Sequence, residues 1–140
     1  MVQRVEHNSV FEIIQENYSE ISARVAEAAR HSSRQLDDIL VLTVTKLQDN
    51  EKIRAAYASG LRFFGESYVE EALPKMALLT DLKDAKWEMV GHVQSRKAKW
   101  VANAFSRIHS VATEKLARLL SSHRDPSACP LEVLMQINLS

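Results

Sequence analysis

Apolar residues near the start of the chain recur at intervals of three and four residues. The pattern runs from Val10 to Ala28, and this spacing is typical of an amphipathic helix. It predicts a helix over residues 9–30, with Asn8 or Ser9 as the N-cap.

Five short apolar runs follow, separated by helical patterns. The first run, Ile39 to Thr45, is rich in β-branched residues and does not alternate with polar ones, as expected for a strand buried on both faces of a parallel sheet. The second predicted strand begins with Leu61–Phe64. The other three are Trp87–Val90, Arg107–Val111 and Leu131–Ile137. The predicted helices are Asp49–Ser59, Ser67–Leu79, Gln94–Phe105 and Thr113–His123. Gly60 should end the first of them, and Pro74 should kink or divide the second. Such alternation predicts either a doubly wound sheet or a (β/α)₈ barrel.

Two features favour the barrel. No glycine-rich turn follows the first strand, and polar residues end several different strands instead of one. A barrel has eight units and about 250 residues, so the prediction is an α/β fold of the (β/α)₈ type, incomplete at about five units. These occupy residues 39–140, and a helix and loop occupy residues 1–38. We expect the inward face and the edges of the first and fifth strands to be open, which predicts self-association or uptake of a complementing segment.

Composition narrows the classes of partner. The 18 Lys and Arg residues balance the 18 Asp and Glu residues, so no global field favours nucleic acid and none is predicted as a partner. The lone Cys129 excludes an internal disulfide, and no Cys or His cluster predicts a metal site. No apolar run has the length of a signal peptide or membrane span. We therefore expect a cytoplasmic protein without membrane contact.

Lys46 ends the first predicted strand. It shares strand parity with Leu40, Leu42 and Val44, so an inward-facing Lys46 would point into the barrel mouth, where barrel enzymes place their sites. A partly desolvated lysine loses its proton more easily, and its neutral amine can form a Schiff base with an aldehyde. From spacing alone, a solvated lysine just past a strand is the more frequent alternative.

Five segments then match, in order, the motifs of one protein family. They are Leu42–Lys46 (LTVTK), Phe64–Glu71 (FGESYVEE), Val90–Lys99 (VGHVQSRKAK), Ile108–Val111 (IHSV) and Val133–Ser140 (VLMQINLS). The corresponding family motifs read AVSK, FGENYVQE, IGHLQSNKAK, IHSVDS and VLLQVNIS. The chain thus resembles the N-terminal part of the pyridoxal-phosphate homeostasis proteins, once called the proline-synthase co-transcribed family and related to the N-terminal barrel of alanine racemases.

The resemblance implies a cofactor and a role. It makes Lys46 the lysine that holds pyridoxal 5′-phosphate (PLP) as a Schiff base, with Ser67, His109 and Asn138 as further cofactor-binding residues. The implied role is binding and buffering of PLP, without an established turnover and without a catalytic residue. Two alternatives stay open: a fragment of a racemase-like PLP enzyme, and a degenerate fragment that binds no ligand.

The chain departs from the family pattern in several places. Ser67 stands where the family has Asn, Glu88 replaces a His, and Leu47–Asp49 replaces a TKP segment that carries a second lysine. The family's phosphate-gripping segments, SMGMS and GSTxVRIG, lie beyond the position equivalent to Ser140. We therefore expect impaired cofactor binding in this truncated form.

Other polar residues have ordinary interpretations. His92 is expected to be a hydrogen-bonded structural residue, and the basic residues of 96–99 are expected on a solvated helix face. Glu66, Glu70 and Glu71 could act as acids or bases, but the last two are expected on the first helical turn, where the helix dipole favours carboxylates.

Overall fold

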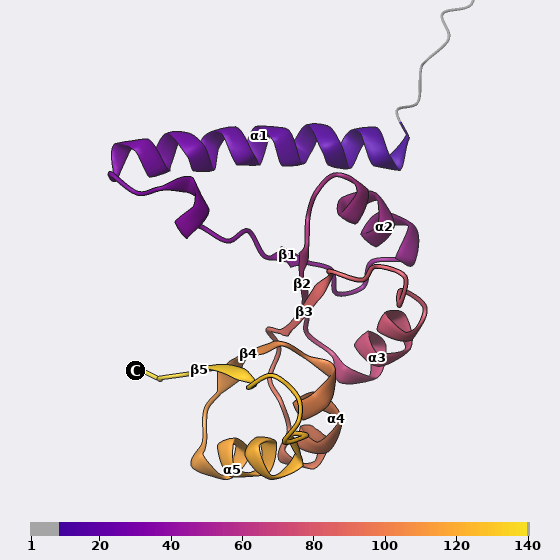
Figure 1. Cartoon of the computed structure of the whole chain (residues 1–140), viewed down its shortest axis with the longest axis vertical. Helices are drawn as coiled ribbons and strands as arrows, with labels where there is room; N and C mark the ends of the chain where they lie inside the picture. Colours follow the sequence, from indigo (N-terminus) through magenta and orange to yellow (C-terminus); the bar gives the residue numbers. More distant parts are fainter. Residues whose placement is uncertain (1–8, 140) are drawn as a thin grey trace, which may run out of the picture. The chain divides into compact units, whose positions relative to one another are not determined.

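The computed structural model describes residues 9–139, which form two compact units. One unit, here called the helical unit, comprises residues up to 41 together with residues 48–61. The other, the sheet unit, comprises residues 42–47 and the chain from residue 62 onward. Each unit is coloured by sequence in Figure 1.

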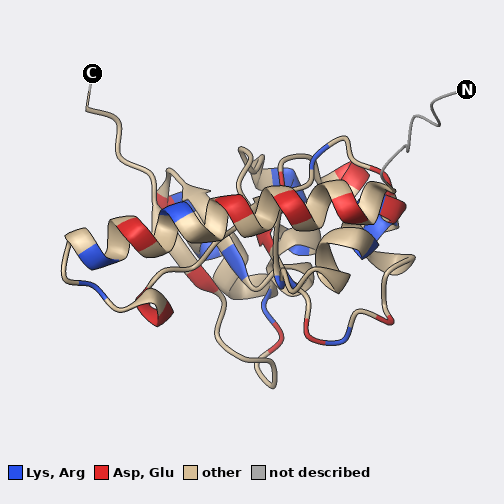
Figure 2. Cartoon of the chain, turned by 90° about the horizontal axis from the view of Figure 1, so that it is seen from above, with Lys and Arg blue, Asp and Glu red and all other residues tan. Residues whose placement is uncertain are grey.

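The helical unit contains α1 (Val10–His31), the 3₁₀ turn η1 (Leu36–Asp38) and α2 (Asn50–Ala58). Ser9 caps α1 as predicted, and its hydroxyl and the Glu12 carboxylate form a reciprocal capping box. Asp49 caps α2, and Gly60 follows that helix with a φ of 101° that favours glycine. The α1 helix packs against α2 and carries acidic and basic residues along its length (Figure 2).

The sheet unit contains five parallel strands in sequential order, β1-β2-β3-β4-β5. Their bounds are β1 Thr43–Val44, β2 Phe63–Glu66, β3 Lys86–Met89, β4 Arg107–Val111 and β5 Glu132–Met135. The helices between them are α3 (Val69–Ala77), the 3₁₀ turn η2 (Ser95–Lys97), α4 (Ala98–Ala104) and α5 (Glu114–His123). Parallel neighbours joined by helices in chain order are the pattern of a (β/α)₈ barrel. The predicted fold class, an incomplete barrel of this type, is confirmed.

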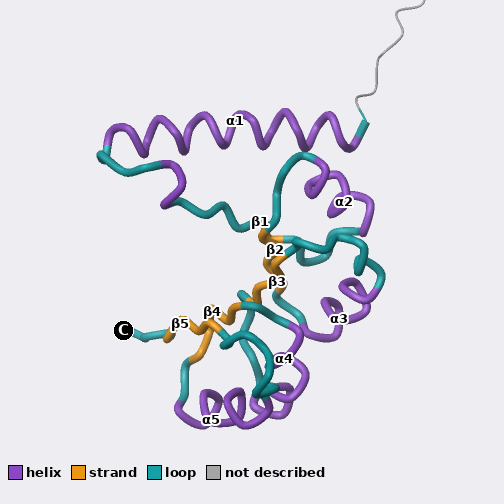
Figure 3. The backbone as a smooth tube through the Cα atoms, in the orientation of Figure 1, coloured by secondary structure: helices purple, strands orange, loops and turns teal. Residues whose placement is uncertain are grey.

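The three helices α3, α4 and α5 lie on one side of the sheet, as Figure 3 shows. We call this side the helix-covered face and the other side the open face. The core of the sheet unit lies on the helix-covered side and includes the fully buried Met89, Val101 and Ile108. On the open face, Val44 is 50% exposed, and at the sheet edge Met135 of β5 is 78% exposed. The predicted open edges are therefore present, at β1 and β5.

Some predicted boundaries differ from the structure. The strand expected over Ile39–Thr45 is only Thr43–Val44, because β1 is an edge strand and these two residues alone pair with β2. The helix expected over Gln94–Phe105 begins as the turn η2 and continues as α4. Pro74 lies inside α3 without dividing it, and the helix continues to Ala77.

Within residues 9–139, no helix combines the length and the apolar character needed to cross a bilayer.

Candidate functional site

The ladder of the sheet connects residues near the carboxyl ends of β1, β2 and β3 to the first residue of β4. Val44 pairs with Gly65, Gly65 with Glu88, and Glu88 with Arg107. Two positions further along these strands come Lys46, Ser67, Val90 and His109. Alternate residues of a strand share a face, so this register, continued, brings the predicted Lys46, Ser67 and His109 into one row on the open face.

Packing at Gly65 supports this assignment of faces. A Cβ built there would lie 3.3 Å from a methyl of Val90, 3.4 Å from one of Val44 and 3.5 Å from one of Leu42. These side chains therefore occupy the same side of neighbouring strands. Leu42 and Val44 thus share a face, as expected from their parity with Lys46.

Lys46 lies in a turn directly after β1, and its side chain is exposed. Among residues 9–139, its amine has no hydrogen-bond or ion-pair partner. The residue after it, Leu47, has a φ of 60°, in the left-handed region that disfavours side chains other than glycine. The structure therefore presents a free amine beside a strained residue at the end of a parallel strand.

Ser67 follows β2 directly, at a point of close backbone approach. A Cβ on Gly91 would lie 2.1 Å from the carbonyl oxygen of Ser67, so only glycine fits there. The hydroxyl of Ser110 donates a 2.6 Å hydrogen bond to the carbonyl of Gly91. These contacts tie together the ends of β2, β3 and β4.

Asn138 lies outside the row. It is exposed and lines a recess formed by the end of β4, the start of α5 and the residues after β5. The structure therefore brings three of the four predicted binding residues to one row and leaves the fourth in a separate recess.

His109 belongs to a charged group on the open face that we call the Glu88 cluster. The cluster consists of Glu88, Arg107, His109 and Glu132. Glu88 is 1% exposed, and its carboxylate lies 2.6 Å from Nε2 of His109 and 3.1 Å from the Arg107 guanidinium. Arg107 also donates to Glu132, and this bond and the nearby carboxylates raise the pKa of Arg107.

Sequence reasoning noted Glu88 only as a departure from the family pattern. The signal that could have located the cluster is alternation: Glu88 stands between the apolar Trp87 and Met89, which directs its carboxylate to the face opposite theirs.

A second charged group, the Lys75 cluster, lies on the helix-covered side. It consists of Thr45, Glu66, Glu71 and Lys75. The Lys75 side chain is 7% exposed and that of Glu66 is fully buried. The Lys75 amine donates to the carbonyl of Thr45 at 2.9 Å, to Glu66 at 2.8 Å and to Glu71 at 2.7 Å. An ammonium group has three protons, so all of its donors are used.

The Lys75 cluster reaches the backbone on both sides of Lys46. The hydroxyl of Thr45 donates to Glu66 at 2.7 Å, and the amide of Leu47 donates to Glu71 at 2.6 Å. The hydrogen bond from Lys75, followed by that from the Leu47 amide, lowers the pKa of Glu71 against the opposing effect of burial. Sequence reasoning placed Glu71 correctly on the first helical turn but missed its partner. The spacing of four residues from Glu71 to Lys75 was the available signal.

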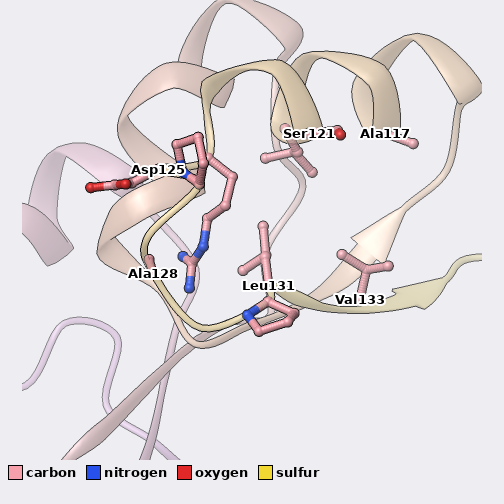
Figure 4. Close-up of a pocket in the computed structure, with 10 residues that line it drawn as sticks. Ala117, Ser121, Asp125, Ala128, Leu131 and Val133 are labelled. Atoms are coloured by element: carbon pink, nitrogen blue, oxygen red, sulfur yellow. The ribbon is translucent and has the colours of Figure 1, made fainter.

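Another recess on the helix-covered side does not involve these residues. It has a volume of about 480 Å³ and lies between α5, the loop after it and β5. In Figure 4, Val133 approaches it from β5, Leu131 from the residue just before that strand, and Ala117 and Ser121 from α5. None of the predicted binding residues lines it.

The donors on the open face suit a small carbonyl ligand. A free amine can bond covalently to an aldehyde, and the hydroxyl of Ser67 can donate to and accept from polar atoms. Within the described part of the chain, no group of three or more His, Cys, Asp and Glu side chains gathers as metal ligands.

Comparison with known proteins finds similarity to pyridoxal phosphate homeostasis proteins. The pyridoxal phosphate homeostasis protein of Pseudomonas aeruginosa is 40% identical over 127 residues, which are 91% of this chain and 55% of that protein. PipY of Synechococcus elongatus, solved with PLP bound, is 40% identical and has a TM-score of 0.61, covering 71% of this chain and 47% of PipY.

A third protein shows the fold alone. A structure of an unknown protein from Bifidobacterium adolescentis has a TM-score of 0.75 at 24% identity, over 84% of this chain and 52% of that one. No family model matches the sequence. The chain spans about half the length of the curated relatives that it matches.

Proposed function

We propose that the chain is a member of the pyridoxal phosphate homeostasis protein family, whose proteins it matches over about half of their length, and that it binds PLP through Lys46. The proposed role is the binding and buffering of this vitamin B6 cofactor in the cytoplasm, without turnover of a substrate. Its relative PipY was solved with PLP bound, which supports the choice of ligand. The alternative of a racemase-like enzyme fragment is not favoured by these relatives.

The observation that carries the proposal is the free, exposed amine of Lys46 at the carboxyl end of β1. A neutral lysine amine adds to an aldehyde carbon, and water leaves as the carbon–nitrogen double bond of the Schiff base forms. An amine already held in ion pairs could not do this without breaking them. Lys46 is free of such bonds among the described residues.

Ser67 and His109 are proposed as further contacts of the cofactor. Their support is the register of the sheet, which continues from the paired residues to one row with Lys46. Asn138 is proposed as a contact from the family motif alone, since it lines a separate recess. The chemistry of this set suits the aldehyde and hydroxyl end of PLP.

A labelling experiment tests the proposal. The chain is incubated with PLP, reduced with borohydride, digested and mapped by mass spectrometry. We expect stable labelling of Lys46 in preference to exposed lysines such as Lys83 and Lys99, and loss of that label in Lys46→Ala. Equal labelling of all exposed lysines would contradict site-specific binding and leave the non-binding alternative.

We also propose that the open edges at β1 and β5 support self-association. Large apolar side chains are exposed in and after β5, including Val133, Met135 and Ile137, and unpaired strand edges readily pair with another chain. Size-exclusion chromatography with light scattering should show a species larger than the 15.9 kDa monomer. A monomer at all concentrations would contradict this.

A further inference from the structure

Lys46 lies between two residues whose backbone atoms are held by one buried ion network. On one side, the carbonyl of Thr45 accepts from the Lys75 amine. On the other, the amide of Leu47 donates to the Glu71 carboxylate. Lys75 and Glu71 are themselves joined at 2.7 Å. The Lys75–Glu71 pair therefore bridges the turn that carries Lys46.

The bridge holds Leu47 in an unfavourable conformation. A left-handed φ costs a residue with a side chain about 1–2 kcal/mol, and the side chain of Leu47 is 75% exposed, so burial offers little compensation. The bond from its amide to Glu71 is the described contact that opposes relaxation of this turn. Unusual backbone geometry of this kind is concentrated at functional sites.

The cluster is costly for a purely stabilising device. Burying an ion pair incurs a desolvation penalty that its attraction often only balances. Here Oε2 of the buried Glu66 also has no hydrogen-bond partner among the described residues, which adds a further cost. An arrangement with little net gain in stability is explained better by the geometry that it imposes on the backbone around Lys46.

We infer that Lys75 and Glu71 are positioning residues for Lys46, fixing its turn so that its amine is presented on the open face, a role that rests on the proposed binding of PLP by Lys46. In this proposal, Lys75 contacts neither the amine of Lys46 nor the ligand. It acts through Thr45 and through Glu71.

The first part of the test needs no cofactor. Hydrogen exchange of the Leu47 amide is followed by NMR in the unaltered chain and in Glu71→Ala, Glu71→Gln and Lys75→Met. We expect slow exchange in the unaltered chain, at least tenfold faster exchange in Glu71→Ala and Lys75→Met, and partial rescue by Glu71→Gln, which keeps an acceptor oxygen. Glu70→Ala is the matched control, because Glu70 is next to Glu71 on α3 but pairs with Lys97 instead.

The second part measures the reactivity of Lys46. Rates of labelling by PLP with borohydride, and by formaldehyde with cyanoborohydride, are measured for Lys46 and for Lys99 in the same molecules. We expect the rate at Lys46 to fall about tenfold in Glu71→Ala and Lys75→Met, as for loss of one charge-assisted hydrogen bond. The rate at Lys99 and the circular dichroism spectrum should not change. If Lys75→Met does not fold, Glu71→Ala, at a partly exposed position, decides the question.

The outcomes separate the two proposals. If PLP does not label Lys46 in the unaltered chain, the proposed function fails, and the positioning role is decided by amide exchange and by formaldehyde. If Lys46 is labelled equally fast in the unaltered chain, Glu71→Ala and Lys75→Met, the positioning role is overturned. If the variants slow Lys46 selectively and Glu71→Gln restores part of the rate, it is supported.

Discussion

The Lys75 cluster and the Glu88 cluster are each built around one buried carboxylate, yet they act on different parts of the sheet. In the Lys75 cluster, the bonds of Lys75 and Glu71 reach main-chain atoms on either side of Lys46. In the Glu88 cluster, the bonds join side chains across β3, β4 and β5. The first therefore fixes the course of one turn, and the second fixes the alignment of neighbouring strands. The same type of interaction has a different consequence according to whether its hydrogen-bond partners are main-chain or side-chain atoms.

The largest effect expected from the comparison of the two clusters is at Lys75. We expect Lys75→Met to lower the free energy of unfolding by about 3–5 kcal/mol, because it leaves two carboxylates and a buried carbonyl without their donor. Urea denaturation measures the change. The control is Lys97→Met, which removes a pair with the exposed Glu70 and should cost less than about 1 kcal/mol. An equal decrease in the free energy of unfolding in both variants would show that burial does not strengthen the interactions of the Lys75 cluster.

The second test concerns Glu88. We expect Glu88→Gln to cost about 2 kcal/mol, since the buried carboxylate bonds both Arg107 and His109. Glu132→Gln should cost less than about 1 kcal/mol, because Glu132 is 64% exposed. Both values come from urea denaturation at neutral pH. A larger loss at Glu132 would mean that the edge strand, and not the buried carboxylate, dominates this region.

The third test is the pH dependence of stability. The pKa of Glu71 is lowered from its ordinary value of 4.5 by Lys75 and the Leu47 amide. Its contribution is therefore fully present above pH 4.5 and is lost as the pH falls through the lowered pKa of the folded state. Thermal unfolding from pH 7 down to pH 3 should show a steeper loss in the unaltered chain than in Glu71→Gln. Parallel curves would contradict the assigned role of this carboxylate.

The smallest expected effect is at Leu47. We expect Leu47→Gly to raise the free energy of unfolding by less than about 1 kcal/mol, because relief of the left-handed conformation exceeds the entropy cost of glycine only slightly. Ser33→Gly is the matched control, since Ser33 is exposed and has a φ of 55° outside the sheet unit. A clear loss of stability in Leu47→Gly would indicate that its side chain makes an important contact.

Periodicity and local signals predicted the element order well. The strand Arg107–Val111 has the predicted bounds, and Ser9 is one of the two N-caps expected for α1. Asp49, expected inside its helix, is instead the cap of α2. The expected strand over Ile39–Thr45 was too long, because the paired length of an edge strand depends on its neighbour and not on its own residues. Apolar β-branched sequence indicates what can be a strand, and pairing decides how much of it is one.

The site was predicted less completely than the fold. The motif placed Lys46 at a strand end, and the structure gives it an exposed amine there. The two charged clusters could not be derived from sequence, because Thr45 and Lys75 are thirty residues apart and meet only through the sheet and α3. Isolated charged residues look alike in a sequence, and only tertiary structure decides which of them are buried together.

The three hydrogen bonds of Lys75 also bear on competition between amines for an electrophile. Lys46 and Lys75 stand at the same strand end, and an aldehyde arriving there meets two primary amines of equal intrinsic chemistry. Lys75 would have to give up three hydrogen bonds and leave a buried site before it could attack, whereas Lys46 faces solvent. On the proposed function, the same hydrogen bonds would make the reaction chemoselective, because they withdraw Lys75 from reaction while they hold the turn that presents Lys46.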